Sequence, residues 1–220
     1  KKEILTNYLL ESQDWLVWNG YYDINAVGRQ VMPGKEKGNA ATVNNAHEYM
    51  DIPLSSPLGA RYYPYSDFGI YRSRYSWCAS IRMQSNHLYG FENTLSENML
   101  GYFCSDGALL VRKSGTEYLE IGPVWNWKHI PGTTTYDDGK ALWGCDNLPP
   151  YNKTDKVFGN VFGDTMVAAM DYNRDGLTAR KAWFFFEDGI LCLGAGITMS
   201  KGFPVVTTVE QNIFGGKPTS

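Results

Sequence analysis

Hydrophobic positions near the start of the chain recur at the spacing of an amphipathic helix. Between residues 3 and 18 the apolar side chains fall on one stripe, and the acidic residues fall elsewhere. Since no Ser, Thr, Asp or Asn cap precedes residue 4, we expect the chain to begin inside a longer helix or helical domain. No other stretch predicts a helix. The members of the stripe are Ile4, Leu5, Tyr8, Leu9, Trp15 and Leu16.

After Gly20 the pattern changes to short runs rich in Tyr, Val, Ile, Phe and Trp, separated by Gly, Pro, Asn and Asp. Such runs are typical of antiparallel strands joined by turns. Asp-Gly pairs at 106–107, 175–176 and 188–189 stand between apolar runs, where tight hairpins need residues that tolerate a positive φ. They predict consecutive strands paired as a meander. The predicted strands are 21–27, 75–85, 99–104, 107–112, 117–121, 165–172, 177–186, 189–197 and 204–213.

Two stretches, 30–68 and 128–160, are rich in Gly, Pro, Asn and Tyr and show little alternation, so they predict long surface loops of the kind that often carry binding residues. The fold class that we predict is all-β: a large antiparallel β-sandwich in residues 20–220, preceded by one short N-terminal helix in residues 1–19. The apolar run 183–186 predicts a strand covered on both faces, with Trp183 and Phe185 on one face and the other two on the opposite face.

Composition and charge exclude two classes of partner. Of the 220 residues 43% are hydrophobic and 20% charged, which suffices for a buried core. A formal charge of −3 and a pI near 5.6 leave no basic footprint for nucleic acid. No stretch of about 18 apolar residues occurs that could span a membrane. The first residues, Lys1-Lys2-Glu3, include no initiator Met and no signal segment, so we expect that something upstream has been removed.

Residues that could hold a metal or a cofactor form no known motif. Cysteines at 78, 104, 145 and 192 lie too far apart for a zinc knuckle, and they predict buried free thiols or, in an oxidising compartment, two disulfides. Residues 171–176 match the opening of a calcium-binding EF-hand loop, but Ala182 stands where the bidentate Glu belongs, so we predict a hairpin turn there. No His pair has a zinc spacing and no nucleophile elbow occurs. We expect neither a metal nor a cofactor.

Aromatic residues, 15% of the chain, gather in segments that we predict as loops. Tyrosines stand at 62, 63, 65, 71 and 75, and Trp125 and Trp127 form a second group. The faces of Tyr and Trp stack on sugar rings, so these groups favour a carbohydrate cleft. They fit a sheet edge or a core equally well, and the sequence leaves both readings open.

Nine short segments give the chain a recognisable signature. They are Gly20-Tyr21-Tyr22-Asp23, Gly28-Arg29, Ser80 to Asn86, ENTLSENMLG at 92–101, Asp106-Gly107, Pro123 to Trp127, Ile130 to Thr134, Ala179 to Phe186 and Leu193 to Ile197. In unchanged order over roughly residues 3–213, they resemble the central β-sandwich of polysaccharide lyase family 8, which contains hyaluronate, chondroitin AC, chondroitin ABC-type and xanthan lyases. The resemblance implies a secreted or periplasmic bacterial enzyme in which an α/α-toroid domain precedes an antiparallel super-sandwich, with the substrate cleft between them.

The resemblance also implies the reaction, a β-elimination across a uronic acid. A proton leaves C5, the C4–O bond breaks, and the product carries a 4,5-unsaturated sugar. In this family an Asn neutralises the uronate carboxylate, while a Tyr, helped by a His, moves the proton. Because a free phenol has a pKa near about 10, a cation must lie beside it to lower that pKa. The family supplies this cation as an Arg, which a Glu holds in place.

Carried onto this chain, the resemblance implies that Arg29 is the cation and that Glu92 pairs with it and orients it. Asn98, Trp125 and Trp127 stand in resembling segments, and we expect them to contact substrate. The Asn, His and Tyr of the reaction belong to the helical domain. We therefore expect this chain to need that domain as a partner and to be inactive alone.

Three positions depart from the family's pattern. Pro33 and His87 stand where many members have Arg, and Leu95 stands where some have Asn. The acidic polysaccharide, whether hyaluronan, chondroitin or another polyanion, therefore stays open. The sequence predicts the sandwich part of a uronate-cleaving lyase, and the alternative is a non-catalytic carbohydrate-binding sandwich.

Overall fold

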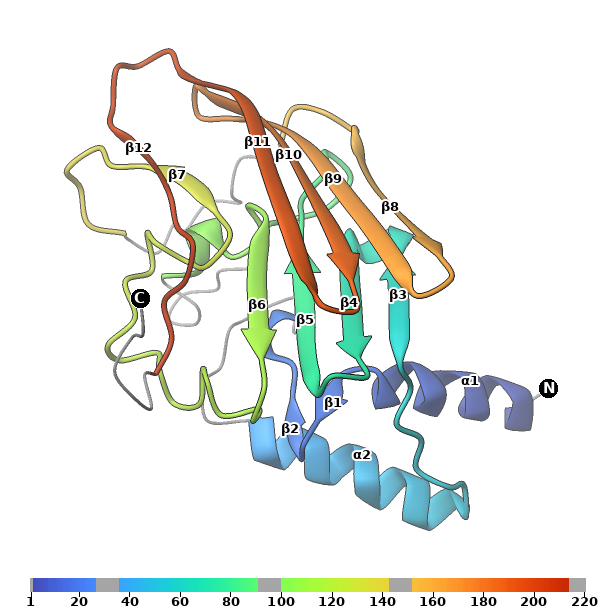
Figure 1. Cartoon of the computed structure of the whole chain (residues 1–220). Helices are drawn as coiled ribbons and strands as arrows, with labels where there is room; N and C mark the ends of the chain where they lie inside the picture. The colour runs from blue at the N-terminus through green and yellow to red at the C-terminus, as the bar shows by residue number, and fades with distance from the viewer. Residues whose placement is uncertain (1, 27–35, 91–99, 143–151, 214–220) are drawn as a thin grey trace.

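Two four-stranded antiparallel sheets lie face to face (Figure 1), which confirms the predicted sandwich. The computed structural model describes residues 2–26, 36–90, 100–142 and 152–213. The first sheet has the order β3-β4-β5-β6, with β3 (Gly59–Tyr63), β4 (Phe68–Ser73), β5 (Trp77–Arg82) and β6 (Ala108–Arg112). The second has the order β11-β10-β9-β8, with β8 (Val157–Phe162), β9 (Thr165–Arg174), β10 (Leu177–Phe186) and β11 (Gly189–Met199). Two small ribbons pair β1 (Val17–Trp18) with β2 (Tyr21–Tyr22) and β7 (Thr134–Tyr136) with β12 (Val205–Thr207).

Two of the three predicted Asp-Gly turns are hairpins of the second sheet. Asp175 and Gly176 have φ values of 56° and 92° and join β9 to β10, which confirms a hairpin in place of a calcium loop. The predicted turn at 188–189 also lies in a hairpin: residues 187 and 188 join β10 to β11, and Gly189 is the first residue of β11. The third prediction is wrong. Gly107, with φ 83°, leads into β6, which pairs with β5, and the predicted strand 99–104 contains instead the 3-10 helix η3 (Gly101–Phe103).

Alternate residues of β10 face the first sheet, as predicted. Trp183 and Phe185 are buried, while Phe184 is half-buried and Phe186 is 42% exposed. The prediction that both faces of this strand are covered is wrong for the described residues, because no layer among them covers the outer face. A run of apolar residues indicates that a strand has apolar side chains on both faces, but it does not show whether another layer of the protein covers each face. The large apolar side chains exposed on β8, β10 and β11 are Phe158, Phe162, Phe186, Leu191, Leu193 and Ile197.

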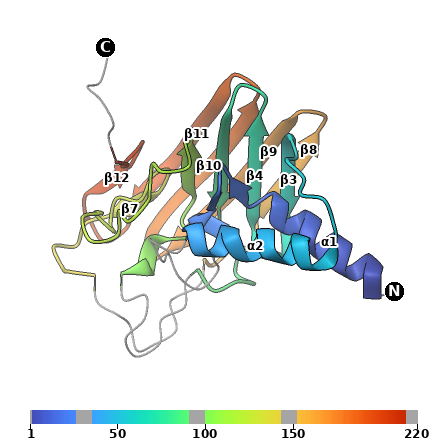
Figure 2. The ribbon, with the colours of Figure 1, turned by 90° about the horizontal axis from the view of Figure 1, so that it is seen from below.

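Two helices lie side by side below the first sheet (Figures 1 and 2). The helix α1 (Lys2–Asp14) confirms the predicted N-terminal helix. The helix α2 (Glu36–Met50) lies in a stretch predicted as loop, so the expectation of a single helix is wrong. Its buried stripe holds mostly small or polar residues, and hydrophobic periodicity therefore does not mark it. These buried residues are Glu36, Ala40, Val43 and His47.

The strands β3 and β4 also lie where no strand was predicted. All six residues of β4 are buried, because the second sheet covers one face and Trp15, Leu16 and Trp18 cover the other. A strand buried on both faces shows no polar alternation. Conversely, the predicted strand 117–121 is wrong, since these residues form turns.

The described cysteines carry free thiols, with Cys78 and Cys104 buried and Cys192 exposed, so the buried-thiol reading holds for two of the three. Cys145 lies outside the described residues. Among the described helices none is both long and apolar enough to cross a membrane.

Candidate functional site

The sequence-predicted residues Arg29, Glu92 and Asn98 lie outside the described residues. The structure does describe the residues at which segments 27–35, 91–99 and 143–151 join the sandwich, which we call stems. The stems at Asn25, Gly90 and Asn152 all contact residues 82–86, the last residue of β5 and the four that follow, which we call the β5 end. The candidate site is built around this point.

The first stem is held by side-chain amide bonds. Asn25 lies in the 3-10 helix η1 (Ile24–Ala26), and its Nδ2 donates to the Ala108 carbonyl at 2.9 Å and to the Ser80 carbonyl at 3.3 Å. Its backbone N–H donates to the Asp23 carboxylate at 2.8 Å. Asp23 in turn accepts from the buried Arg112 at 2.5 Å. The first stem is therefore fixed to β5 and β6 two residues before segment 27–35 begins.

Arg82 joins the first stem to the second. Its Nη1 donates to the Asn25 carbonyl at 3.2 Å, and its Nε donates to Ser105 Oγ at 3.0 Å. The Ser105 hydroxyl donates in turn to the Gly90 carbonyl. Burial lowers the pKa of Arg82, although the guanidinium stays charged at neutral pH. One side chain and one hydroxyl thus connect the residues that lead into segments 27–35 and 91–99.

Gln84 holds the third stem. Its backbone carbonyl accepts from Asn152 Nδ2 at 2.7 Å, and the same Nδ2 donates to the Asp171 carbonyl at 3.0 Å. Gly90 also lies against Gln84, since a Cβ on Gly90 would come within 2.5 Å of Gln84 Oε1. A larger residue at position 90 would therefore displace the Gln84 amide from its present position.

A buried ion pair lies next to the β5 end. Arg174 Nη2 donates to Asp106 Oδ2 at 2.5 Å, and neither side chain is exposed. The same carboxylate oxygen accepts from the Tyr172 hydroxyl at 2.8 Å, and Arg174 Nη1 donates to Gln84 Oε1 at 3.3 Å. Burial opposes the charge on Arg174, but Asp106 and the surrounding tyrosines outweigh it and raise the pKa of Arg174. This pair fixes the end of the second sheet against the β5 end.

A depression of about 450 Å³ opens beside this pair. Its wall includes Tyr102 and Tyr136, whose hydroxyls both donate to Asp175, and burial raises the pKa of Tyr136 to about 12 and that of Tyr102 further. Both tyrosines therefore stay protonated at neutral pH and are not suited to act as a base. On its rim Lys128 pairs with Asp137 at 2.8 Å and with Asp138 at 3.3 Å.

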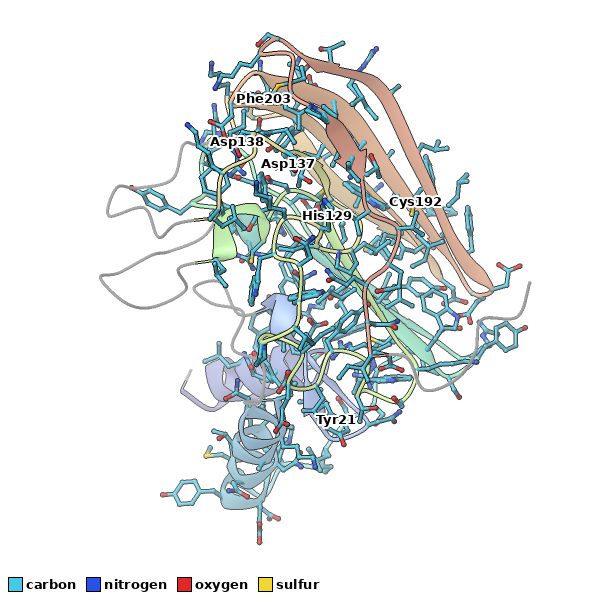
Figure 3. All side chains as sticks on the ribbon, turned by 90° about the vertical axis from the view of Figure 1, so that its left-hand side faces the viewer. Tyr21, His129, Asp137, Asp138, Cys192 and Phe203 are labelled. Atoms are coloured by element: carbon cyan, nitrogen blue, oxygen red, sulfur yellow. The ribbon has the colours of Figure 1, made fainter. Side chains whose placement is uncertain are left out.

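Residues from three parts of the chain border this depression: Tyr102 and Phe103, Lys128, and five residues between 136 and 142. Leu142, the last of these, directly precedes segment 143–151. Figure 3 places Asp137 and Asp138 near Phe203, which lies outside the lining and whose ring stacks on Tyr136 with centroids 5.9 Å apart. Among the described residues no group of His, Cys, Asp and Glu is arranged to hold a metal ion.

The two predicted tryptophans pack together with ring centroids 5.2 Å apart. Trp125 is 5% exposed, and its indole N–H donates to the Gln211 carbonyl at 3.2 Å. Trp127 is half-buried and donates to the Gly122 carbonyl at 3.0 Å. The protein itself covers the ring of Trp125, and substrate contact by either residue stays a prediction. Of the predicted tyrosine group, Tyr71 is buried in the core and Tyr65 is 93% exposed, so that group has no common role.

Sequence reasoning missed Arg82, Ser105 and the ion pair of Arg174 with Asp106. A signal was present, because Arg82 and Arg174 each interrupt or end an apolar strand, and a charge in such a place is expected to be paired. The partners of these charges were not visible, since they lie between 23 and 90 residues away along the chain.

Comparisons with known proteins agree with this architecture. The family description "polysaccharide lyase family 8, super-sandwich domain" matches residues 58–220. Chondroitinase-AC of Pedobacter heparinus is 38% identical over 152 residues, 66% of this chain and 20% of that protein. Hyaluronate lyase of Thermasporomyces composti is 31% identical over 191 residues, 80% of this chain and 23% of that protein.

A solved structure of chondroitinase AC lyase, from work on its oligosaccharide complexes, is similar with a TM-score of 0.77 and 28% identity, over 97% of this chain and 35% of that one. The chain spans about a fifth of the length of the curated relatives that it matches.

Proposed function

Because the chain belongs to polysaccharide lyase family 8, we propose that it is the β-sandwich part of a longer, secreted or periplasmic bacterial lyase that cleaves uronic-acid-containing polysaccharides of the hyaluronan or chondroitin type by β-elimination. The sandwich contributes one wall of the substrate cleft. A helical toroid domain of the same protein contributes the other wall. The domain boundary after residue 19 stays a prediction.

One observation carries this proposal beyond family membership. The stems that lead into the segments of Arg29 and Glu92 are tied to each other through Arg82 and Ser105, although 65 positions separate residues 25 and 90. A guanidinium and a carboxylate that act as a pair need such a common base. The depression lined by Tyr102 and Tyr136 adds an aromatic wall of the kind that sugar rings contact.

In the proposed reaction this chain supplies electrostatics and the helical domain supplies the proton acceptor. We assign to Arg29 the place beside the tyrosine of the helical domain, where it would lower the pKa of that tyrosine from about 10 towards neutrality. We assign to Glu92 the part of a hydrogen-bond acceptor that would fix the direction of Arg29. The described tyrosines of the depression have raised pKa values and do not compete for the proton. The chain without the helical domain therefore lacks the proton acceptor, and we propose that it is inactive alone.

The test uses the full-length protein with hyaluronan, chondroitin and xanthan, and follows the ultraviolet absorbance of the unsaturated uronate. Arg29→Ala is expected to lower kcat by about 100-fold to 1,000-fold, the scale for loss of one preorganised charge, with a small change in KM. Glu92→Gln is expected to keep part of the activity, because the amide oxygen still accepts from Arg29. Arg180→Ala, on the exposed face of β10, is the matched control and keeps wild-type turnover.

Two results would contradict the proposal. If the full-length protein forms no unsaturated product from any of the three polysaccharides, the lyase assignment fails. If Arg29→Ala changes only affinity in a protein that binds but does not cleave, the non-catalytic carbohydrate-binding alternative is correct.

A further inference from the structure

The three stems reach the β5 end from distant parts of the sequence. Asn25 meets the Arg82 guanidinium, Gly90 lies against the Gln84 amide and bonds to Ser105, and Asn152 bonds to the Gln84 carbonyl. A further backbone bond of 3.0 Å runs from the Asn86 N–H to the Thr154 carbonyl. No side chain of the β5 end other than Arg82 connects the first stem with the second in the described residues.

The backbone of the β5 end is itself held firmly. β5 lies between β4 and β6 in the first sheet. Beyond the strand, the Met83 N–H donates to the Asp67 carbonyl at 2.9 Å and the Ser85 N–H donates to the Asp67 carboxylate at 2.7 Å. The Arg82 carbonyl accepts from the Gly107 N–H at 3.1 Å. Arg82 therefore projects from a rigid base, which suits it to position what it touches.

The geometry of the bonds requires an arginine. Nε and Nη1 donate from one planar group to two acceptors, Ser105 Oγ and the Asn25 carbonyl, on separate segments. Lysine carries a single ammonium on a flexible chain and does not reproduce this fork. Ser105 completes the link because its hydroxyl accepts from Arg82 and donates to the Gly90 carbonyl.

We propose that Arg82 is a positioning residue of the lyase reaction, which sets the separation of the two stems that lead into the segments of Arg29 and Glu92. This inference rests on the proposed function. Arg82 touches no reacting atom in this scheme and acts through the pair that it positions. A displacement of about 1 Å in a catalytic group can cost about 100-fold in rate even when the mutated residue is remote.

The experiment uses the full-length enzyme and compares Arg82→Gln, Arg82→Lys and Ser105→Ala, with Arg180→Gln on the exposed face of β10 as control. Arg82→Gln is expected to lower kcat by about 100-fold with KM nearly unchanged, and Arg82→Lys to retain an intermediate rate. The rising limb of the pH profile of kcat/KM is expected to move to higher pH, since a displaced Arg29 lowers the pKa of the catalytic tyrosine less. A purely structural role would reduce the amount of folded enzyme and leave that limb in place.

The double variant Arg82→Gln with Glu92→Gln separates the two explanations further. If Arg82 acts through the pair of Arg29 and Glu92, the fold-decrease in kcat of the double variant is smaller than the product of the fold-decreases of the two single variants. A double variant whose fold-decrease in kcat equals the product of the two single fold-decreases overturns the inference while the lyase assignment stands. A pH limb that does not move in Arg82→Gln, whatever its kcat, overturns it as well. If Arg82→Gln does not fold, Ser105→Ala decides, because it removes the hydroxyl that joins Arg82 to the Gly90 carbonyl and leaves the bond from Arg82 to the Asn25 carbonyl in place. A shifted limb supports the inference and an unchanged one overturns it. Absence of product from the wild-type enzyme is the separate failure of the proposed function.

Discussion

The two ends of one strand, β9, differ in what holds the sheets together. Its inward side chains begin with Met166 and Ala168 in an apolar core and end with Tyr172 and Arg174 in a hydrogen-bonded polar network. The polar end is also the end at which Asn152 and the β5 end meet β9. The comparison teaches that the apolar end holds the sheets together by packing, whereas the polar end fixes directions, which a catalytic pair requires and hydrophobic contact does not supply.

The first of the two largest effects is expected at the polar end. Asp106→Ala removes the shorter of the two ion pairs of the buried Arg174 guanidinium and leaves only the contact with Asp175 at 3.7 Å, so the free energy of unfolding is expected to fall by about 3 kcal/mol. The double variant Asp106→Ala with Arg174→Met removes both charges and is expected to recover much of this loss. Urea denaturation measures both. A double variant no more stable than the single one would show that the pair itself, and not the unpaired charge, carries the energy.

The next effect breaks the apolar end. Met166 is 1% exposed and lies against Gly69 and Ile81, so Met166→Ala leaves a cavity and is expected to cost about 3 kcal/mol. Met166→Leu keeps the volume and is expected to cost less than about 1.5 kcal/mol. Neither variant is expected to change the pH profile of the lyase reaction. A shifted pH profile in Met166→Leu would mean that the apolar end of β9 also positions catalytic groups, and the proposed difference between the two ends of β9 would be wrong.

Lys181 of β10 pairs with Met170 of β9, between the apolar and the polar end of β9. Its ammonium lies over the Trp183 ring and donates to the Gly132 carbonyl. Burial lowers its pKa to about 8, below the value of about 10.4 of a free lysine. Between these values the unfolded chain keeps the proton that the folded chain has released, so stability rises with pH in this window. Relative to Lys181→Met, the free energy of unfolding of the wild type is expected to rise by about 2 kcal/mol from about pH 7 to pH 10. A constant difference across this range would contradict the lowered pKa.

The smallest effect is expected on the outer face of the second sheet. Leu193 is 50% exposed, and Leu193→Ser is expected to change the free energy of unfolding by no more than about 0.5 kcal/mol. Thermal melting beside Met166→Ala supplies the comparison, because both residues belong to the same sheet and differ in the face that they occupy. A large fall in the free energy of unfolding of Leu193→Ser would mean that the outer face of the second sheet is buried in the protein as it exists in solution.

The part of the fold that could be predicted from the sequence is the part with local signals. β10 was predicted to the residue, since polar positions alternate at its start and Asp-Gly turns stand at both ends. α2 was not, because its buried face includes the polar residues Glu36 and His47, and His47 pairs with Asp14 of α1. β4 was not, because burial on both faces removes the alternation on which the prediction depends.

The candidate site divides in the same way. Arg29 and Glu92 came from resemblance to a family, through the motifs around them, and their roles stay predictions. Arg82 lies inside one of those motifs, yet its role depends on the Asn25 carbonyl and the Ser105 hydroxyl. The spacing of residues along the chain does not show which backbone carbonyl a side chain will bond to. The role of Arg82 could therefore be inferred only from the folded structure.

The common base of the three stems has a consequence for how the protein folds. Residues 25 and 152 contact the β5 end across 57 and 68 positions of the chain, so long loops must close before these contacts form. Contacts of such high sequence separation form late on a folding route. If the proposed function is correct, the lyase activity of the full-length protein is therefore expected to return during refolding together with the last slow burial of the tryptophans, and no species with a formed site on an incomplete sheet is expected to accumulate.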